Sequence, residues 1–261
     1  MSPRYCVLSL PRTGSTWLTE GIYSSLLYDS LNENVINLGE FFTLHPIQGR
    51  ASFAHRIKYV LDEEAMIRKQ IQSIPWPENL GHSLETLMEK RLTTLLAGDK
   101  NQPVVLKYMY WTPRDSEKIN DLENFTKIKN HNFTIVNINR DPFESTISVL
   151  VSKKTNFWIR TTEWNTKNIR LLTKSSITLS PEDVKSTYLE YVRVSKEKQK
   201  LADALNCVNV NYESLKSDCI VNQIPFEEKN LSKKVYNISY DEIITNYNEL
   251  LEIKNQVDNN E

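Results

Sequence analysis

The chain of 261 residues lacks any large excess of charge of one sign. It has 32 Lys and Arg against 33 Asp and Glu, and its formal net charge is −1. A general nucleic-acid binder depends on an excess of basic residues, so this balance argues against that class of protein. It leaves room for a local basic pocket that binds one small anionic ligand.

Long apolar runs and paired cysteines are also missing. No segment approaches the roughly 18 consecutive apolar residues of a membrane helix, and the first residues do not resemble a signal peptide. The cysteines are scattered, form no CxxC pair and belong to no cluster with metal-ligand spacing; they are Cys6, Cys207 and Cys219. We therefore expect a cytoplasmic protein with reduced thiols, no membrane span and no bound metal.

Glycine is scarce, with 6 residues, and neither an internal repeat nor a low-complexity linker divides the chain. A chain of this length can form one large domain with a substantial core. We predict a single domain over residues 1–255. Residues 256–261 are expected to be a disordered tail, because chain ends commonly fray.

Apolar runs alternate with segments of helical periodicity. Strands are predicted at 5–10, 104–107, 133–139 and 208–210, and helices at 15–28, 62–74, 84–97, 116–129, 142–157 and 181–205. This alternation predicts an α/β fold with three layers, in which helices cover both faces of a central parallel sheet. Ligands bind such sheets beyond the carboxyl ends of the strands. Residues 11–17, Lys107 and Arg140 each lie at or just past the end of a predicted strand, so we expect them to meet at that edge.

Residues 11–18, Pro-Arg-Thr-Gly-Ser-Thr-Trp-Leu, follow the first strand and open the first helix. Gly14 lets the backbone turn tightly and approach a ligand. Ser15 and Thr16 begin a helix whose free amides favour an anion, and Arg12 adds a permanent cation that fits phosphate. Each residue alone is compatible with a capped helix and an exposed arginine, but the full set favours a phosphate site. It is not a Walker A loop, because GxxxxGK[ST] is absent.

This segment resembles the 5′-phosphosulfate loop of the sulfotransferase family, in which Pro-Lys/Arg-Ser/Thr-Gly-Ser/Thr-Thr-Trp-Leu is diagnostic. The family takes a sulfuryl group from 3′-phosphoadenosine-5′-phosphosulfate (PAPS) and releases adenosine 3′,5′-bisphosphate (PAP). The resemblance implies a P-loop NTPase-like sulfotransferase fold, with Trp17 stacked on adenine; a core aromatic under the loop is the alternative for Trp17. It also implies that the 5′-phosphosulfate is held by Arg12, Thr13, Gly14, Ser15 and Thr16.

Two further segments resemble the same family. Residues 140–148, Arg-Asp-Pro-Phe-Glu-Ser-Thr-Ile-Ser, match its second signature, which implies that Arg140 and Ser148 bind the 3′-phosphate. A cation and a hydroxyl on separate elements suit a dianion. Residues 211–215, Asn-Tyr-Glu-Ser-Leu, are similar to the segment whose tyrosine contacts adenine, which implies that role for Tyr212. The family's C-terminal Arg-Lys-Gly loop over the 3′-phosphate is absent, and its candidate substitutes are Lys229, Lys233 and Lys234.

The cytosolic members of the family carry Lys-Thr-His at a strand end, and this chain lacks that histidine, so its general base must be another residue. Here residues 107–109 are Lys-Tyr-Met. Residues 38–42, Leu-Gly-Glu-Phe-Phe, resemble the glutamate segment of the bacterial trehalose-type sulfotransferases, and tyrosylprotein-type enzymes also use a glutamate. The resemblance therefore implies that Glu40 takes the acceptor proton, and its aromatic neighbours would desolvate the carboxylate, which suits a base. A surface or capping carboxylate is the alternative for Glu40, and the rival bases are His45, His55 and His82.

Lys107 ends an apolar strand, which is costly for a cation unless it meets an anion. The resemblance implies that Lys107 and Arg12 stabilise the charge that develops on the leaving phosphate. A lysine that merely snorkels at the sheet edge is the alternative. The predicted function is sulfuryl transfer from PAPS to a hydroxyl or amine of a small-molecule, glycan or peptide acceptor. A nucleotide kinase and a non-catalytic nucleotide-binding protein are the other two hypotheses.

Overall fold

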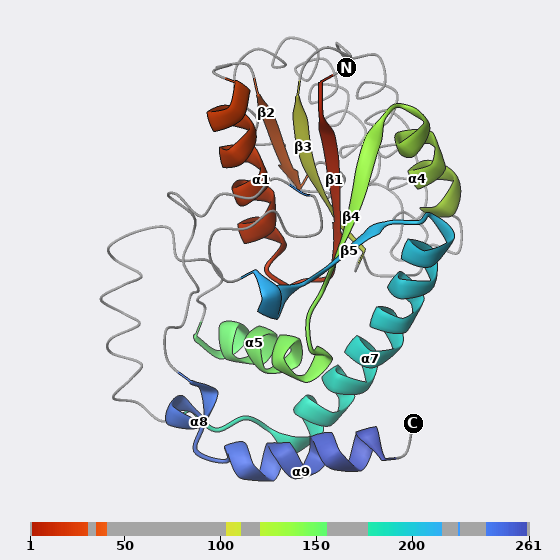
Figure 1. The fold of residues 1–261 in the computed structure, drawn as a ribbon. Coiled ribbons are helices and arrows are strands. Elements are labelled where there is room, and N and C mark those ends of the chain that lie inside the picture. Colours follow the sequence, from red (N-terminus) through yellow and green to blue (C-terminus); the bar gives the residue numbers. More distant parts are fainter. Residues whose placement is uncertain are drawn as a thin grey trace, which may run out of the picture.

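In the part of the chain that the structure describes, five parallel strands form one central sheet (Figure 1). The computed structural model describes residues 2–30, 35–40, 103–110, 121–155, 177–215, 224 and 239–259. Within them the strand order is β2-β3-β1-β4-β5. The strands are β1 (Arg4–Ser9), β2 (Ile36–Glu40), β3 (Val104–Met109), β4 (Phe133–Asn139) and β5 (Val208–Asn211). The predicted α/β class with a central parallel sheet is confirmed.

Helices fill most of the described connections. They are α1 (Ser15–Ser30), α4 (Asp121–Asn130), α5 (Pro142–Thr155), α7 (Pro181–Ala204), α8 (Tyr240–Ile243) and α9 (Tyr247–Asp258), with a short 3-10 helix, η1 (Tyr212–Ser214). Helices α5 and α7 both begin at a proline, the residue that suits a first helical turn. At α7, Ser180 caps the helix by accepting a hydrogen bond from the amide of Asp183. The predicted helices at 62–74 and 84–97 lie outside the described residues.

The two faces of the sheet carry separate hydrophobic clusters. Along β1, Cys6 and Leu8 face a cluster shared with α4 and α7, while Val7 faces the cluster shared with α1. All three side chains are fully buried. Burying a large apolar side chain contributes about 1.5–3 kcal/mol, so this alternation fixes which face each helix covers. The arrangement is three layers, with the sheet in the middle.

A third cluster joins α5, α8, α9 and the first turns of α7 near the carboxyl ends of the strands. Its members include Phe143, Tyr188 and Leu250, all buried. The first residues of the predicted disordered tail are ordered: 256–258 form the end of α9, Val257 is buried in this cluster, and Tyr188 donates a hydrogen bond to Asp258. The order seen for 256–258 corrects the sequence-based expectation, because one apolar side chain at helical spacing is enough to dock this turn.

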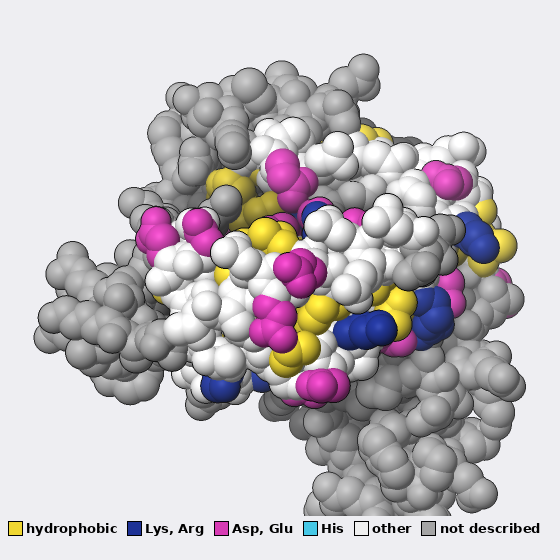
Figure 2. All heavy atoms as spheres, turned by 90° about the horizontal axis from the view of Figure 1, so that it is seen from below, with side chains coloured by type: hydrophobic (Ala, Val, Ile, Leu, Met, Phe, Trp, Pro, Cys, Tyr) yellow, Lys and Arg dark blue, Asp and Glu magenta, His cyan; other side chains and the backbone are white. Residues whose placement is uncertain are grey.

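The exposed side of this layer mixes charges of both signs. Seen from the α8–α9 end, acidic and basic side chains alternate with hydrophobic ones over the described surface (Figure 2). The mixture agrees with the near-zero net charge of the chain.

The sheet order places β1 between β3 and β4. From β1 the chain passes through α1 to β2 on one side, whereas from β4 it continues to β5 on the other. The ends of β1 and β4 therefore flank a topological switch point, which is where open α/β sheets bind ligands. The loop after β1 and residues 140–142 after β4 both lie there.

Candidate phosphate-binding site

The loop between β1 and α1 has an unusual backbone. Arg12 and Gly14 both have positive φ, at 62° and 80°. A Cβ at residue 14 would lie 2.2 Å from Cδ2 of Tyr212, so only glycine fits there. The loop is held from inside, because Thr13 Oγ1 donates to the carbonyl of Leu10 at 2.8 Å. The loop conformation thus places the backbone of Gly14, which has no side chain, at the carboxyl end of the sheet.

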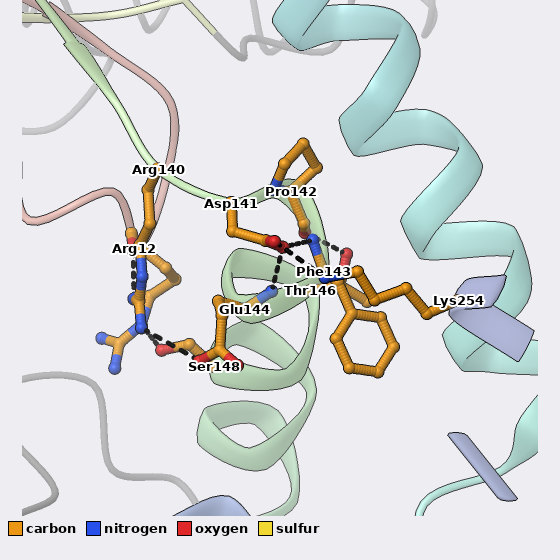
Figure 3. A network of polar contacts seen from close by, with 9 residues as sticks. All are labelled: Arg12, Arg140, Asp141, Pro142, Phe143, Glu144, Thr146, Ser148 and Lys254. Atoms are coloured by element: carbon orange, nitrogen blue, oxygen red, sulfur yellow. Dashed lines mark hydrogen bonds and ion pairs between the residues drawn. The ribbon is translucent and has the colours of Figure 1, made fainter. Parts of the chain in front are cut away.

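Arg12 connects the two segments that the sequence analysis picked out separately (Figure 3). Its Nε donates a hydrogen bond to Oγ of Ser148 at 2.9 Å, across 136 positions of sequence. Its carbonyl accepts a hydrogen bond from Nη1 of Arg140 at 2.8 Å. Ser148 is 2% exposed and lies on α5. Both ends of the second segment therefore contact the same residue of the loop.

Arg140 is largely enclosed at this junction. Its guanidinium lies over the ring of Tyr212, 4.5 Å from the ring centroid, and its Nη2 is 3.6 Å from the carboxylate of Glu144. Burial raises the pKa of Glu144, and the nearby Arg140 opposes that rise. Nε of Arg140 is buried, and no described residue accepts a hydrogen bond from it. An unused buried donor costs free energy, so this atom suits a ligand that brings an acceptor.

Lys107 and Thr16 extend the site toward β3. Lys107 is 5% exposed, and its Nζ donates to Oγ1 of Thr16 at 3.0 Å. The register of β2 and β3 pairs residue 40 with Lys107. The backbone of Glu40 therefore reaches the same edge of the sheet, although its side chain lies outside the described part of the structure. The strand β2 itself was not predicted, because its few residues give a weak pattern.

Trp17 and Tyr212 form an aromatic pair beside the loop. Their rings meet edge to face, with centroids 5.9 Å apart and planes at 69°. Tyr212 is 9% exposed, and Trp17 is half-buried against the α1-side cluster. Burial raises the pKa of the Tyr212 hydroxyl, and Arg140 opposes that rise. The Tyr212 ring thus packs against Gly14, Trp17 and Arg140.

Some predicted site residues serve the loop itself. The hydroxyl of Thr13 is used within the loop, and Ser15, at 5% exposure, begins α1. His131 stands between α4 and β4, at the amino end of the strand and away from this edge. The rival bases His45, His55 and His82 lie outside the described residues, as do the lysines proposed to replace the C-terminal loop.

Asp141 and Tyr191 make hydrogen bonds near the site that were not predicted from the sequence. Asp141 caps α5, because its Oδ1 accepts hydrogen bonds from the backbone amides of Phe143 and Glu144 at 2.7 and 3.1 Å. Its other carboxylate oxygen, Oδ2, lies 2.9 Å from Nζ of Lys254 (Figure 3). The Asp-Pro pair signals such a cap in the sequence. Tyr191 of α7 donates to the carbonyl of Pro11 at 3.1 Å, which no local pattern indicates.

No family model and no curated protein matches the chain. Within the described ranges, no group of three or more His, Cys, Asp and Glu side chains is arranged to hold a metal ion. None of the helices described has the length and apolar character needed to cross a membrane.

Proposed function

We propose that this protein is a sulfotransferase that uses PAPS as its donor, with the P-loop NTPase-like sulfotransferase fold. The observation that carries the proposal is the hydrogen bond from Arg12 to Ser148. These residues belong to two segments that resemble one family at separate places in the sequence. In that family both segments act on a single nucleotide, so they must be neighbours. The order of the strands, with β1 between β3 and β4, supports the proposed fold.

The residues of the site fit a donor with phosphate groups at two positions. Arg12, Lys107 and Arg140 bring three cations to one edge, and Gly14 allows close approach to the backbone. The unused Nε of Arg140 offers a further donor. In this proposal the loop from Arg12 to Thr16 holds the 5′-phosphosulfate, Arg140 and Ser148 hold the 3′-phosphate, and Trp17 and Tyr212 contact the adenine.

The bound donor supplies a sulfuryl group that is activated by its bond to a phosphate oxygen. Glu40 removes the proton from the acceptor hydroxyl or amine as that atom attacks sulfur. Lys107 and Arg12 stabilise the negative charge that develops on the phosphate oxygen as its bond to sulfur breaks. The pairing of residue 40 with Lys107 across β2 and β3 supports this division of roles, because it puts base and cation on adjacent strands.

Transfer of labelled sulfate from PAPS to a panel of sugars, peptides, phenols and alcohols tests the proposal. We expect one acceptor class to be labelled, and Glu40→Gln to abolish the transfer while its affinity for PAP stays within about twofold of wild type. Glu190→Gln, at a partly exposed position of α7 where the carboxylate pairs with Arg193, is the matched control and retains activity. Full activity of Glu40→Gln would instead assign the base to another residue. Phosphate transfer from Mg·ATP in place of sulfate transfer would favour a kinase.

A further inference from the structure

Lys198 on α7 is a buried cation that the site described above does not use. It is 1% exposed, and its Nζ donates to three oxygens of β4: Oδ1 of Asn137 and the carbonyl of Ile138, both at 2.6 Å, and Oδ1 of Asn139 at 2.9 Å. Burial lowers the pKa of this amine to about 7. A buried ammonium is costly unless hydrogen bonds compensate for its lost hydration, and these three contacts provide that compensation.

The contacts continue through Gln199 to the surface. Its Oε1 accepts from Nδ2 of Asn137 and from Nδ2 of Asn139, each at 3.0 Å, and its Nε2 donates to Oδ1 of Asp203 at 2.7 Å. An ammonium only donates, so both asparagine oxygens face Lys198 and both amide groups donate away from it. They donate to Gln199, and Asn137 Nδ2 also donates to Oδ1 of Asn209 at 2.7 Å. The hydrogen bonds therefore run in one direction from the cation to a carboxylate, an arrangement in which each bond strengthens the next.

These hydrogen bonds lie beside an open pocket. A pocket with a volume of about 280 Å³ borders Asn139, Arg140 and Pro142 on one side and Lys198 and Gln199 on the other. Side chains in a close-packed core are held by their neighbours, but a chain segment beside open space is not. The end of β4 pairs with β5 as far as Asn139, and the hydrogen bonds from Lys198 hold its pocket side one residue before Arg140.

We propose that Lys198 is a positioning residue for Arg140. By holding the Ile138 carbonyl and the Asn139 side chain, it fixes the direction in which Arg140 leaves the strand toward Arg12 and Tyr212. The inference rests on the proposed function, in which Arg140 binds the 3′-phosphate. Lys198 itself makes no contact with the nucleotide in this proposal.

Calorimetric titration of Lys198→Met with PAP and with AMP tests this role. We expect the ratio of PAP affinity to AMP affinity to fall about tenfold, the size of losing one charge-assisted hydrogen bond, while AMP affinity is unchanged. Lys200→Met removes an exposed lysine from the same helix and should leave the ratio within about twofold of wild type. Arg140→Ala is the positive control and should lose the preference altogether. A lysine with only a structural role would lower the melting temperature without changing the ratio.

The outcomes separate this inference from the proposed function. If wild type prefers PAP and folded Lys198→Met keeps that preference, the positioning role is wrong and the proposed function stands. If Lys198→Met does not fold, Gln199→Met breaks the same chain of hydrogen bonds at a less buried place and should reduce the ratio about threefold; an unchanged ratio there overturns the role.

If wild type shows no preference for PAP, the proposed function fails. The Nε–H signal of Arg140, identified by its loss in Arg140→Lys, then decides the positioning role by NMR. A changed chemical shift in Lys198→Met supports control of Arg140 by Lys198, and an unchanged shift overturns it.

Discussion

Arg12 adopts a left-handed backbone conformation, which is rare for a residue with a side chain. The conformation costs about 1–2 kcal/mol, and neighbouring contacts must compensate for it. The carbonyl of Arg12 accepts a hydrogen bond from Arg140, and that of Pro11 accepts one from Tyr191. Both donors come from elements far along the chain. The loop is thus set in its conformation by the assembled fold.

Gly14→Ala tests the close approach of the loop to Tyr212. Alanine at φ 80° is strained, and its Cβ would collide with the Tyr212 ring. We expect the free energy of unfolding to fall by about 1–3 kcal/mol and PAP affinity to fall at least tenfold. Urea unfolding and calorimetric titration measure the two effects. Wild-type affinity in Gly14→Ala would show that the observed loop conformation is not needed for binding.

Proximity of Arg12, Arg140 and Ser148 could be predicted from the sequence, because strands in a parallel sheet bring their carboxyl ends to one edge. The contacts of Tyr212 could not be predicted from the sequence. Its ring lies beneath Gly14 and beneath the guanidinium of Arg140, and both contacts depend on how β5 ends beside β4. Sequence spacing carries no information on such a distance.

Helix α5 carries Ser148 to the loop, and its start is fixed by Asp141. Burial by itself would raise the pKa of Asp141, but the hydrogen bond to Lys254 and the amides of Glu144 and Phe143 outweigh it, so the pKa is lowered. A carboxyl group with a lowered pKa in the folded state stabilises the fold above its unfolded pKa, near 3.9. That stabilisation is lost as the pH falls through the lowered value.

Asp141→Asn separates the charge from the cap, since asparagine also caps helices. We expect a loss of about 0.5–1 kcal/mol in unfolding free energy at pH 7, the range of a partly exposed ion pair, and a smaller difference from wild type near pH 2. Urea unfolding at both values measures this. Lys254→Met should lose a similar amount, and the double variant should lose less than the sum. Equal stability of Asp141→Asn and wild type at pH 7 would rule out the contribution of the pair.

The elements with strong patterns could be predicted with good boundaries. Strand β4 spans the predicted 133–139, and α7 begins at the predicted proline. Strand β2 and helices α8 and α9 were missed. In α9 only Leu250, Ile253 and Val257 are buried, so a single narrow stripe docks an otherwise polar helix. Its contact surface comes from α5 and α7, which local sequence does not reveal.

The whole molecule assembles one site from four strands, at or near their carboxyl ends; Lys107 lies within β3, two residues before that strand ends at Met109. Strands β1, β3 and β4 deliver Arg12, Lys107 and Arg140, and Tyr212 follows β5. Helix α5 adds Ser148, and Tyr191 of α7, buried in the cluster that α4 and α7 share with the sheet, donates a hydrogen bond to the loop. Because each group comes from a different element, the site forms only when the sheet is complete. Its cations are gathered inside a chain whose net charge is close to zero.

The most direct test of the account is calorimetric titration of the wild-type protein with PAP, with AMP and Mg·ATP as controls. If Arg140 and Ser148 bind a 3′-phosphate, PAP binds tightly and AMP at least tenfold more weakly, because AMP leaves those two groups without a ligand. Stronger binding of Mg·ATP than of PAP, or no binding of either nucleotide, would contradict the assignment of this site to a sulfuryl donor.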